Sequence, residues 1–173
     1  MSEIVRLQIA PGMELSLSQA RAEELMATLK HQVEGSAPEA NASHGRIVLP
    51  DDHPLWEQHS GLDGHRDHPE WDAGADLAVA EAFYGQVGGK AKVFLDLLID
   101  HPGQQLTVDD LCGLAKGEVF SGKHSVAGAI NGLNHPRQAS GRRYPFYWWT
   151  GSRYAMKPSV AGLFRQARIN LGS

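Results

Sequence analysis

Three apolar stripes of helical period, separated only by short turns, constrain the fold of this chain more than any other feature of its sequence. The first spans residues 90–101 and stops at a Pro-Gly pair, the second spans residues 107–115 and stops at a Lys-Gly pair, and the third spans residues 123–134. Their inward-facing residues are Val93, Phe94, Leu97, Leu98, Leu111, Leu114, Ala115, Val126, Ile130 and Leu133. The pattern therefore predicts three core helices joined by tight turns. The spacing of Thr107 and Asp110 also predicts a capping box at the start of the second helix.

A β-hairpin and a further helix are expected after these three helices. An aromatic run over residues 144–149, a Thr-Gly-Ser turn and a short strand over residues 153–156 indicate the hairpin. Pro158 suits the first turn of a helix, and the residues that follow it have helical apolar spacing.

This order of helix, helix, turn, helix, hairpin and helix resembles the winged helix-turn-helix superfamily, and in particular small bacterial regulators of that type. The resemblance covers about 80 residues and rests on element order and turn placement. It implies a DNA-binding domain whose third helix, residues 123–134, enters the major groove. The hairpin, or wing, would then lie along the backbone or the neighbouring minor groove.

Charge is distributed unevenly along the chain, although the formal net charge is only −4. Residues 1–90 hold 6 basic and 15 acidic residues, a net charge of −9, whereas residues 91–173 hold 10 and 5, a net charge of +5. From Lys116 to the end there are nine basic residues and a single acid, Glu118. This asymmetry predicts a polyanion-binding module attached to a unit with another task.

The third helix and the wing supply candidate DNA contacts. Lys123, His124 and Asn131 carry donors and acceptors for base edges or phosphates, and Ala127 can meet a thymine methyl group. Candidates for phosphate neutralisation in and around the wing are Arg137, Arg142, Arg143 and Arg153. The same basic residues can instead form a solvated basic face.

Two features make the reading of base sequence the weakest step of this hypothesis. Gly128 and Gly132 each lower the intrinsic stability of the third helix by about 1 kcal/mol relative to alanine. The aromatic run is unusually rich, and alternate members of residues 146–149 point to opposite faces of a strand. One set is expected to close the core, and the other to meet the acidic part of the chain or a partner subunit.

Aromatic residues interleaved with arginines can also stack on unpaired bases, so a single-stranded nucleic acid is an alternative target.

We place the winged-helix domain at residues 75–173, with a leading helix over residues 76–84. Residues 1–50, which precede it, are expected to form a small ββαβ unit. Two alternating segments with a Pro-Gly turn between them predict its first strands, an amphipathic segment to about residue 32 predicts its helix, and residues 46–50 resemble a third strand. The expected fold class is thus α+β, mainly α. The small unit would dimerise, sense a ligand or contact other proteins.

Residues 51–74 read as an acidic, histidine-rich linker. Its histidines, weak candidates for a transition-metal site by ligand type alone, are His53, His59, His65 and His68. Their spacing matches no metal-binding motif, and the single cysteine, Cys112, leaves no cysteine cluster for zinc. We therefore expect a solvated acidic loop, with no metal and no cofactor.

An enzyme is not expected. Residues 117–123 fit the phosphate-binding pattern G-x-x-x-x-G-K, but His124 stands where serine or threonine should hold magnesium, and no buried apolar strand precedes the loop. No G-x-S-x-G motif is present either.

The leading expectation is a sequence-specific binder of double-stranded DNA: a bacterial transcriptional regulator, homodimeric because one three-helix module reads only a short half-site. No apolar run approaches the roughly 20 residues that span a bilayer, and the first residues lack the regions of a signal peptide. A cytoplasmic, nucleoid-associated protein is therefore expected. The alternative from a different class is a protein–protein interaction module, in which the acidic half covers the basic surface within one chain or across a dimer.

Overall fold

The computed structural model describes residues 4–10, 13–18, 47–60, 67–116 and 119–172. The chain divides into two compact units, Met1–His44 and Gly45–Ser173. In the first unit, strands β1 (Ile4–Ala10) and β2 (Met13–Ser18) pair antiparallel, as their alternating pattern predicts. The helix expected to end near residue 32 lies outside the described residues.

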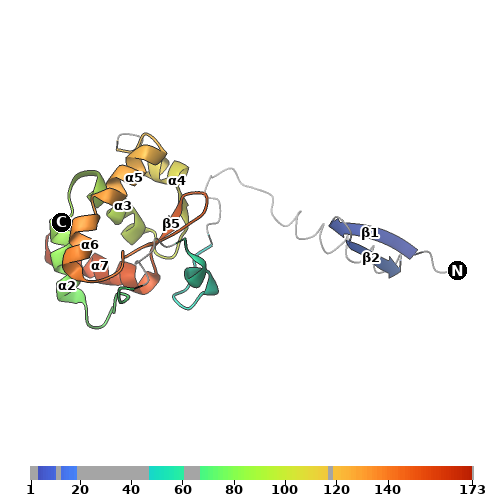
Figure 1. Ribbon diagram of the computed structural model, residues 1–173, viewed down its shortest axis with the longest axis horizontal. Coiled ribbons are helices and arrows are strands. Elements are labelled where there is room, and N and C mark those ends of the chain that lie inside the picture. The colour runs from blue at the N-terminus through green and yellow to red at the C-terminus, as the bar shows by residue number, and fades with distance from the viewer. Residues whose placement is uncertain (1–3, 11–12, 19–46, 61–66, 117–118, 173) are drawn as a thin grey trace. The chain divides into compact units, whose positions relative to one another are not determined.

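The second unit is mainly helical and carries a small three-stranded antiparallel sheet, which confirms the α+β, mainly α class (Figure 1). In chain order its elements are η1 (Pro54–Gln58), α2 (Leu77–Gln86), α3 (Gly89–Asp100), β3 (Leu106–Thr107), α4 (Val108–Leu114), α5 (Lys123–Asn131), α6 (Asn134–Ser140), β4 (Tyr147–Trp149), β5 (Arg153–Ala155) and α7 (Pro158–Asn170). None of the helices in the described part of the chain is long and apolar enough to cross a membrane.

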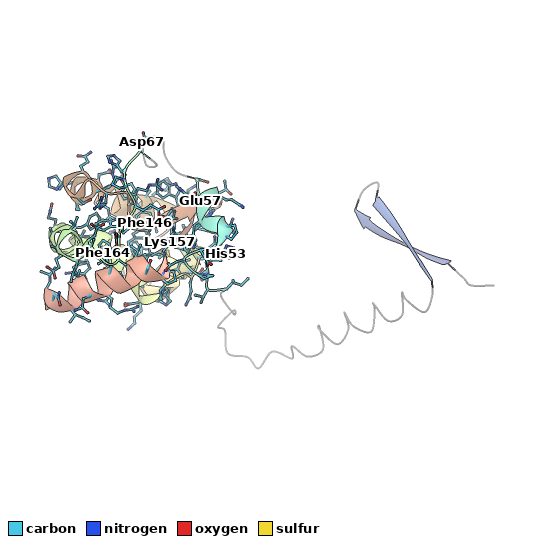
Figure 2. All side chains as sticks on the ribbon, turned by 90° about the horizontal axis from the view of Figure 1, so that it is seen from below. His53, Glu57, Asp67, Phe146, Lys157 and Phe164 are labelled. Carbon is cyan, nitrogen blue, oxygen red and sulfur yellow. The ribbon has the colours of Figure 1, made fainter. Side chains whose placement is uncertain are left out.

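Helix α3 lies at the centre of this unit and packs against α4, α5 and α7. Its buried residues include Phe94, which makes edge-to-face contacts with Phe146 and Tyr154 at centroid distances of 5.1 and 5.5 Å. Helices α2 and α7 pack against each other on the other side of the core, where Phe164 is fully buried. Figure 2 shows Phe146 and Phe164 within the body of the unit.

Local sequence signals set several of these boundaries. The capping box of α4 is present: the Thr107 hydroxyl accepts the Asp110 N–H, and the Asp110 carboxylate accepts the Thr107 N–H at 2.9 Å. Pro158 lies in the first turn of α7, where its missing N–H costs no hydrogen bond.

The third predicted helix is shorter than residues 123–134, because α5 ends at Asn131 and α6 begins at Asn134. Gly132 caps α5, and a Cβ there would come within 3.0 Å of the Ala91 Cβ, so glycine permits the close approach of α5 to α3. Helix α6 was missed because its polar sequence and Pro136 resemble a loop, although proline is tolerated in a first helical turn.

The sheet has the order β3-β5-β4, and residues 47–60 pack against it. Val48 forms an antiparallel bridge with Gln104. Trp56 is buried against Tyr147 and Trp149, and it donates its indole N–H to the Pro50 carbonyl at 2.7 Å. In place of the strand expected at residues 46–50, the described residues 47–50 form a single β-bridge, and they pack in the second unit together with the first part of the expected linker. The alternation predicted for the aromatic run is confirmed, since Phe146 and Trp148 pack in the main core whereas Tyr147 and Trp149 pack against residues 47–60.

The attachment of residues 47–49 can be tested at Gly103. This residue has a φ of +72°, and a Cβ would lie 2.6 Å from the Leu49 carbonyl oxygen; Gly141 has a φ of +62° with nothing within 4 Å of a Cβ. Both Gly103→Ala and Gly141→Ala should lower the free energy of unfolding by about 1–2 kcal/mol, because alanine is strained in a left-handed backbone conformation. Gly103→Ala should lower it by about 1–3 kcal/mol more, because the backbone at Leu49 must move away from the new Cβ atom. Urea unfolding measures both, and equal losses would contradict the close packing at Leu49.

Candidate nucleic-acid interface

The outward face of α5 gathers four of the predicted DNA-binding residues. Val126 and Ala129 are buried, whereas the other side of the helix exposes Lys123, His124, Ala127, Gly128 and Asn131. We call these five exposed residues the α5 face. Residues four apart lie in one row on a helix, so Lys123, Ala127 and Asn131 follow one another along it. None of the five forms a side-chain hydrogen bond or ion pair with the described part of the chain.

The two glycines near the end of α5 have different surroundings. Gly132 is required by packing against α3, whereas a Cβ at Gly128 would meet nothing within 4 Å. Among the described residues, therefore, no packing contact requires glycine at position 128. Gly128 and Ala127 leave the middle of the α5 face without long side chains. A helix surface with small or absent side chains lets a partner approach the helix backbone closely.

Arg142 lies apart from this face and is held by a buried acid. Its Nη2 atom is 2.7 Å from Oδ1 of Asp76, the residue before α2, which is only 3% exposed. This hydrogen bond holds the pKa of the Asp76 carboxyl below its usual value, although burial acts in the opposite direction. Arg142 thus neutralises an internal charge.

Arg143 contacts a second acid, Glu70, which also contacts Lys157 and Tyr147. The Glu70 carboxylate lies 3.1 Å from Arg143 Nη1, 3.3 Å from Lys157 Nζ and 3.1 Å from the Tyr147 hydroxyl. Burial acts to raise the pKa of Glu70, but Lys157, Tyr147 and Arg143 together hold it below its usual value. Arg143 also donates from Nε to the His68 carbonyl at 2.7 Å. The structure therefore fixes this arginine on the acidic segment over residues 67–76.

Only part of the basic surplus of the sequence is therefore available at the surface. Among the nine basic residues from Lys116 onward, all of which are described, four pair with acids of the same chain: Arg142, Arg143, Lys157 and Arg168. The other five, for which no ion pair with a described acid is found, are Lys116, Lys123, Arg137, Arg153 and Arg165.

Of the remaining predicted contacts, Arg137 and Arg153 lie in different elements. The guanidinium of Arg137, in α6, lies over the Tyr144 ring at 5.3 Å from its centroid. Arg153 begins β5 and is exposed, and it donates to the Thr150 carbonyl and the Gln105 side chain, each at 3.3 Å. Only the four residues of α5 are brought together on one element.

The described histidines of the acidic segment do not gather into a metal site. His53 Nδ1 accepts the Leu55 N–H at 3.1 Å and so caps η1, and His59 is buried with its ring 5.0 Å from that of Tyr147. Figure 2 shows His53 and Asp67 at separate places on the edge of the unit. His65 lies outside the described residues. Within those residues, no three histidine, cysteine or acidic side chains are arranged to hold a metal ion.

The Asp76–Arg142 pair predicts a dependence of stability on pH. Because the pKa of Asp76 is lower in the folded than in the unfolded chain, the pair stabilises the fold above about pH 4, and this stabilisation is lost as pH falls through the folded pKa. Asp76→Asn should lower the free energy of unfolding by about 1–2 kcal/mol at pH 7. The difference in this free energy between the variant and the wild type should shrink below about pH 4.

The control is Asp100→Asn, which removes a more exposed partner of Arg168 and should cost less than about 1 kcal/mol. Urea titrations at pH 7 and pH 3 measure both variants. A deficit for Asp76→Asn that stays constant over this range would contradict the assigned role of the carboxylate.

Comparison with known proteins gives one family. Residues 77–171, more than half of the chain, match the profile of a family described as a family of unknown function (DUF6416). No curated protein and no solved structure matches the chain. The matched region runs from the first residue of α2 to just after α7, so it excludes Glu70, Asp76 and the segment that packs on the sheet.

Proposed function

The chain belongs to this family of unknown function, DUF6416, and we propose that its region α3–α7 is a winged helix-turn-helix that binds duplex DNA through the α5 face. The order α3, β3, α4, α5, α6, β4 and β5 supports this proposal, with α6 inserted between the proposed recognition helix and the wing. The sheet order β3-β5-β4 supports it too, because the hairpin pairs with a strand located between α3 and α4. The observation that carries the proposal is an exposed helix face of polar and small residues whose side chains form no hydrogen bond or ion pair with the residues that the structure describes.

The residues of the α5 face suit contacts with a DNA groove. Lys123 can neutralise a phosphate, while His124 and Asn131 offer donors and acceptors to base edges. Ala127 and Gly128 permit close approach, and the Ala127 methyl group can meet a thymine methyl group. Gly122, the residue before α5, has no side chain with which to cap the helix; the Ser125 N–H donates to the Gly122 carbonyl at 3.1 Å, which leaves the N–H groups of Lys123 and His124 to meet an anion.

The wing has a smaller part in this proposal than the arginine content of the sequence suggests. One face of the β4–β5 hairpin is covered by Trp56 and His59. Arg142 and Arg143 are occupied by Asp76 and Glu70, which leaves Arg153 as the phosphate contact of the wing. Arg137 supports the interface from α6.

A protein of this kind would act as a transcriptional regulator on the bacterial nucleoid in the cytoplasm. One nine-residue helix with a short wing reads only a few base pairs, so two copies of the chain are expected on a DNA site.

Fluorescence anisotropy with labelled DNA tests the proposal. Lys123→Glu should weaken binding to a mixed-sequence duplex at low salt by about tenfold or more, and Lys123→Ala should reduce the slope of log affinity against log salt by about one. Arg165→Glu is the matched control, since it makes the same change of charge on α7, outside the α5 face. It should change the affinity about twofold at most.

Three outcomes separate the alternatives. Steep salt dependence with selective loss in Lys123→Glu supports duplex binding. Much tighter binding to a single strand than to a duplex would replace the target by unpaired bases. Absence of binding to any mixed-sequence duplex at low salt would overturn the proposal and favour a protein-binding domain whose basic residues are neutralised within the chain.

A further inference from the structure

Several helices of the second unit end at a residue with left-handed backbone, but one of these residues is a lysine. Helix α6 ends at Gly141 with φ 62°, and α7 is followed by Gly172 with φ 69°. Helix α4 is followed by Lys116 with φ 56°. Glycine adopts this conformation without steric penalty, whereas a residue with a Cβ atom is strained there. The chain thus uses lysine at a position where it elsewhere uses glycine.

Nothing within the described fold accounts for this choice. The Lys116 side chain is exposed and makes no hydrogen bond or ion pair with a described residue; only its backbone N–H is bonded, to the Gly113 carbonyl at 3.1 Å. A cation near the end of α4 is attracted by the terminal carbonyls, but a lysine one residue earlier would gain the same attraction without left-handed strain. The strain therefore points to a task for the side chain outside the fold.

We propose that Lys116 is a further phosphate-contacting residue of the DNA interface, retained in a strained backbone for its side chain. This inference rests on the proposed function of the α5 face. Lys116 lies two residues after α4, and Lys123 is the first residue of α5, so two exposed lysines lie at the two ends of the connection between these helices. In helix-turn-helix domains the helix before the recognition helix crosses the DNA backbone, which is where a lysine at its end would meet a phosphate.

Lys116→Gly separates function from stability, because it should raise the stability of the fold and weaken the binding of DNA. We expect the melting temperature of the full chain to rise by about 2–4 °C through relief of strain. We expect affinity for a mixed-sequence duplex at low salt to fall by about five- to tenfold, with the salt slope reduced by about one. Lys116→Arg, which keeps the charge, should bind like the wild type.

Two controls isolate the contact. Ser152→Gly relieves a comparable left-handed conformation, φ 54°, in the wing turn without removing a charge, and should leave the affinity within about twofold. Arg165→Gln removes one positive charge from α7 and should do the same.

Failure of this inference differs from failure of the proposed function. If the wild type binds duplex DNA and Lys123→Glu does not, but Lys116→Gly binds as tightly as the wild type, the role of Lys116 is wrong and that of α5 stands. An unchanged or lower melting temperature for Lys116→Gly would contradict the strain. If the wild type does not bind duplex DNA, the proposed function fails and this inference fails with it.

Discussion

The burial of α3 in the middle of the second unit is the interaction on which the other elements depend. Phe94 connects the helices to the sheet, because its ring contacts both Phe146 before β4 and Tyr154 in β5. Ala91, one turn earlier, receives Gly132 at a distance that excludes any larger residue without movement. Since apolar contacts with α3 fix one side of α5, its other side is free to carry residues without a structural task.

Ion pairs between distant parts of the chain change the meaning of its charge distribution. Asp76 and Glu70 come from the acidic stretch, and they neutralise arginines that follow α6. Exposed pairs contribute little to stability, but the carboxylate of Asp76 is almost completely buried and needs its partner. Internal ion pairs therefore use part of the basic surplus, and the cations proposed to contact DNA reduce to Lys116, Lys123, Arg137 and Arg153, none of which forms an ion pair with a described acid.

The packed unit is larger than the region that defines the family. The family match begins at residue 77, yet residues before it supply two tryptophans to the interior. Trp56 packs on the outer face of the hairpin, and Trp71 contacts Phe83 and Phe164 edge-on while donating to the Arg143 carbonyl at 2.8 Å. The contacts of Trp56 cover one face of the wing, which is why α5 is the stronger candidate for contact with DNA.

The sequence by itself determined the elements whose signals lie between close neighbours. Apolar spacing predicts α3, and the Thr107–Asp110 spacing predicts the start of α4. The helical spacing of apolar residues in α5 predicts which of its residues are exposed. Only the tertiary structure decided where α5 ends, because that depends on the contact with Ala91, and which arginines remain unpaired. The partners of Arg142 and Arg143 lie far away along the chain, and an ion pair depends on distance in space, which no local pattern of residues records.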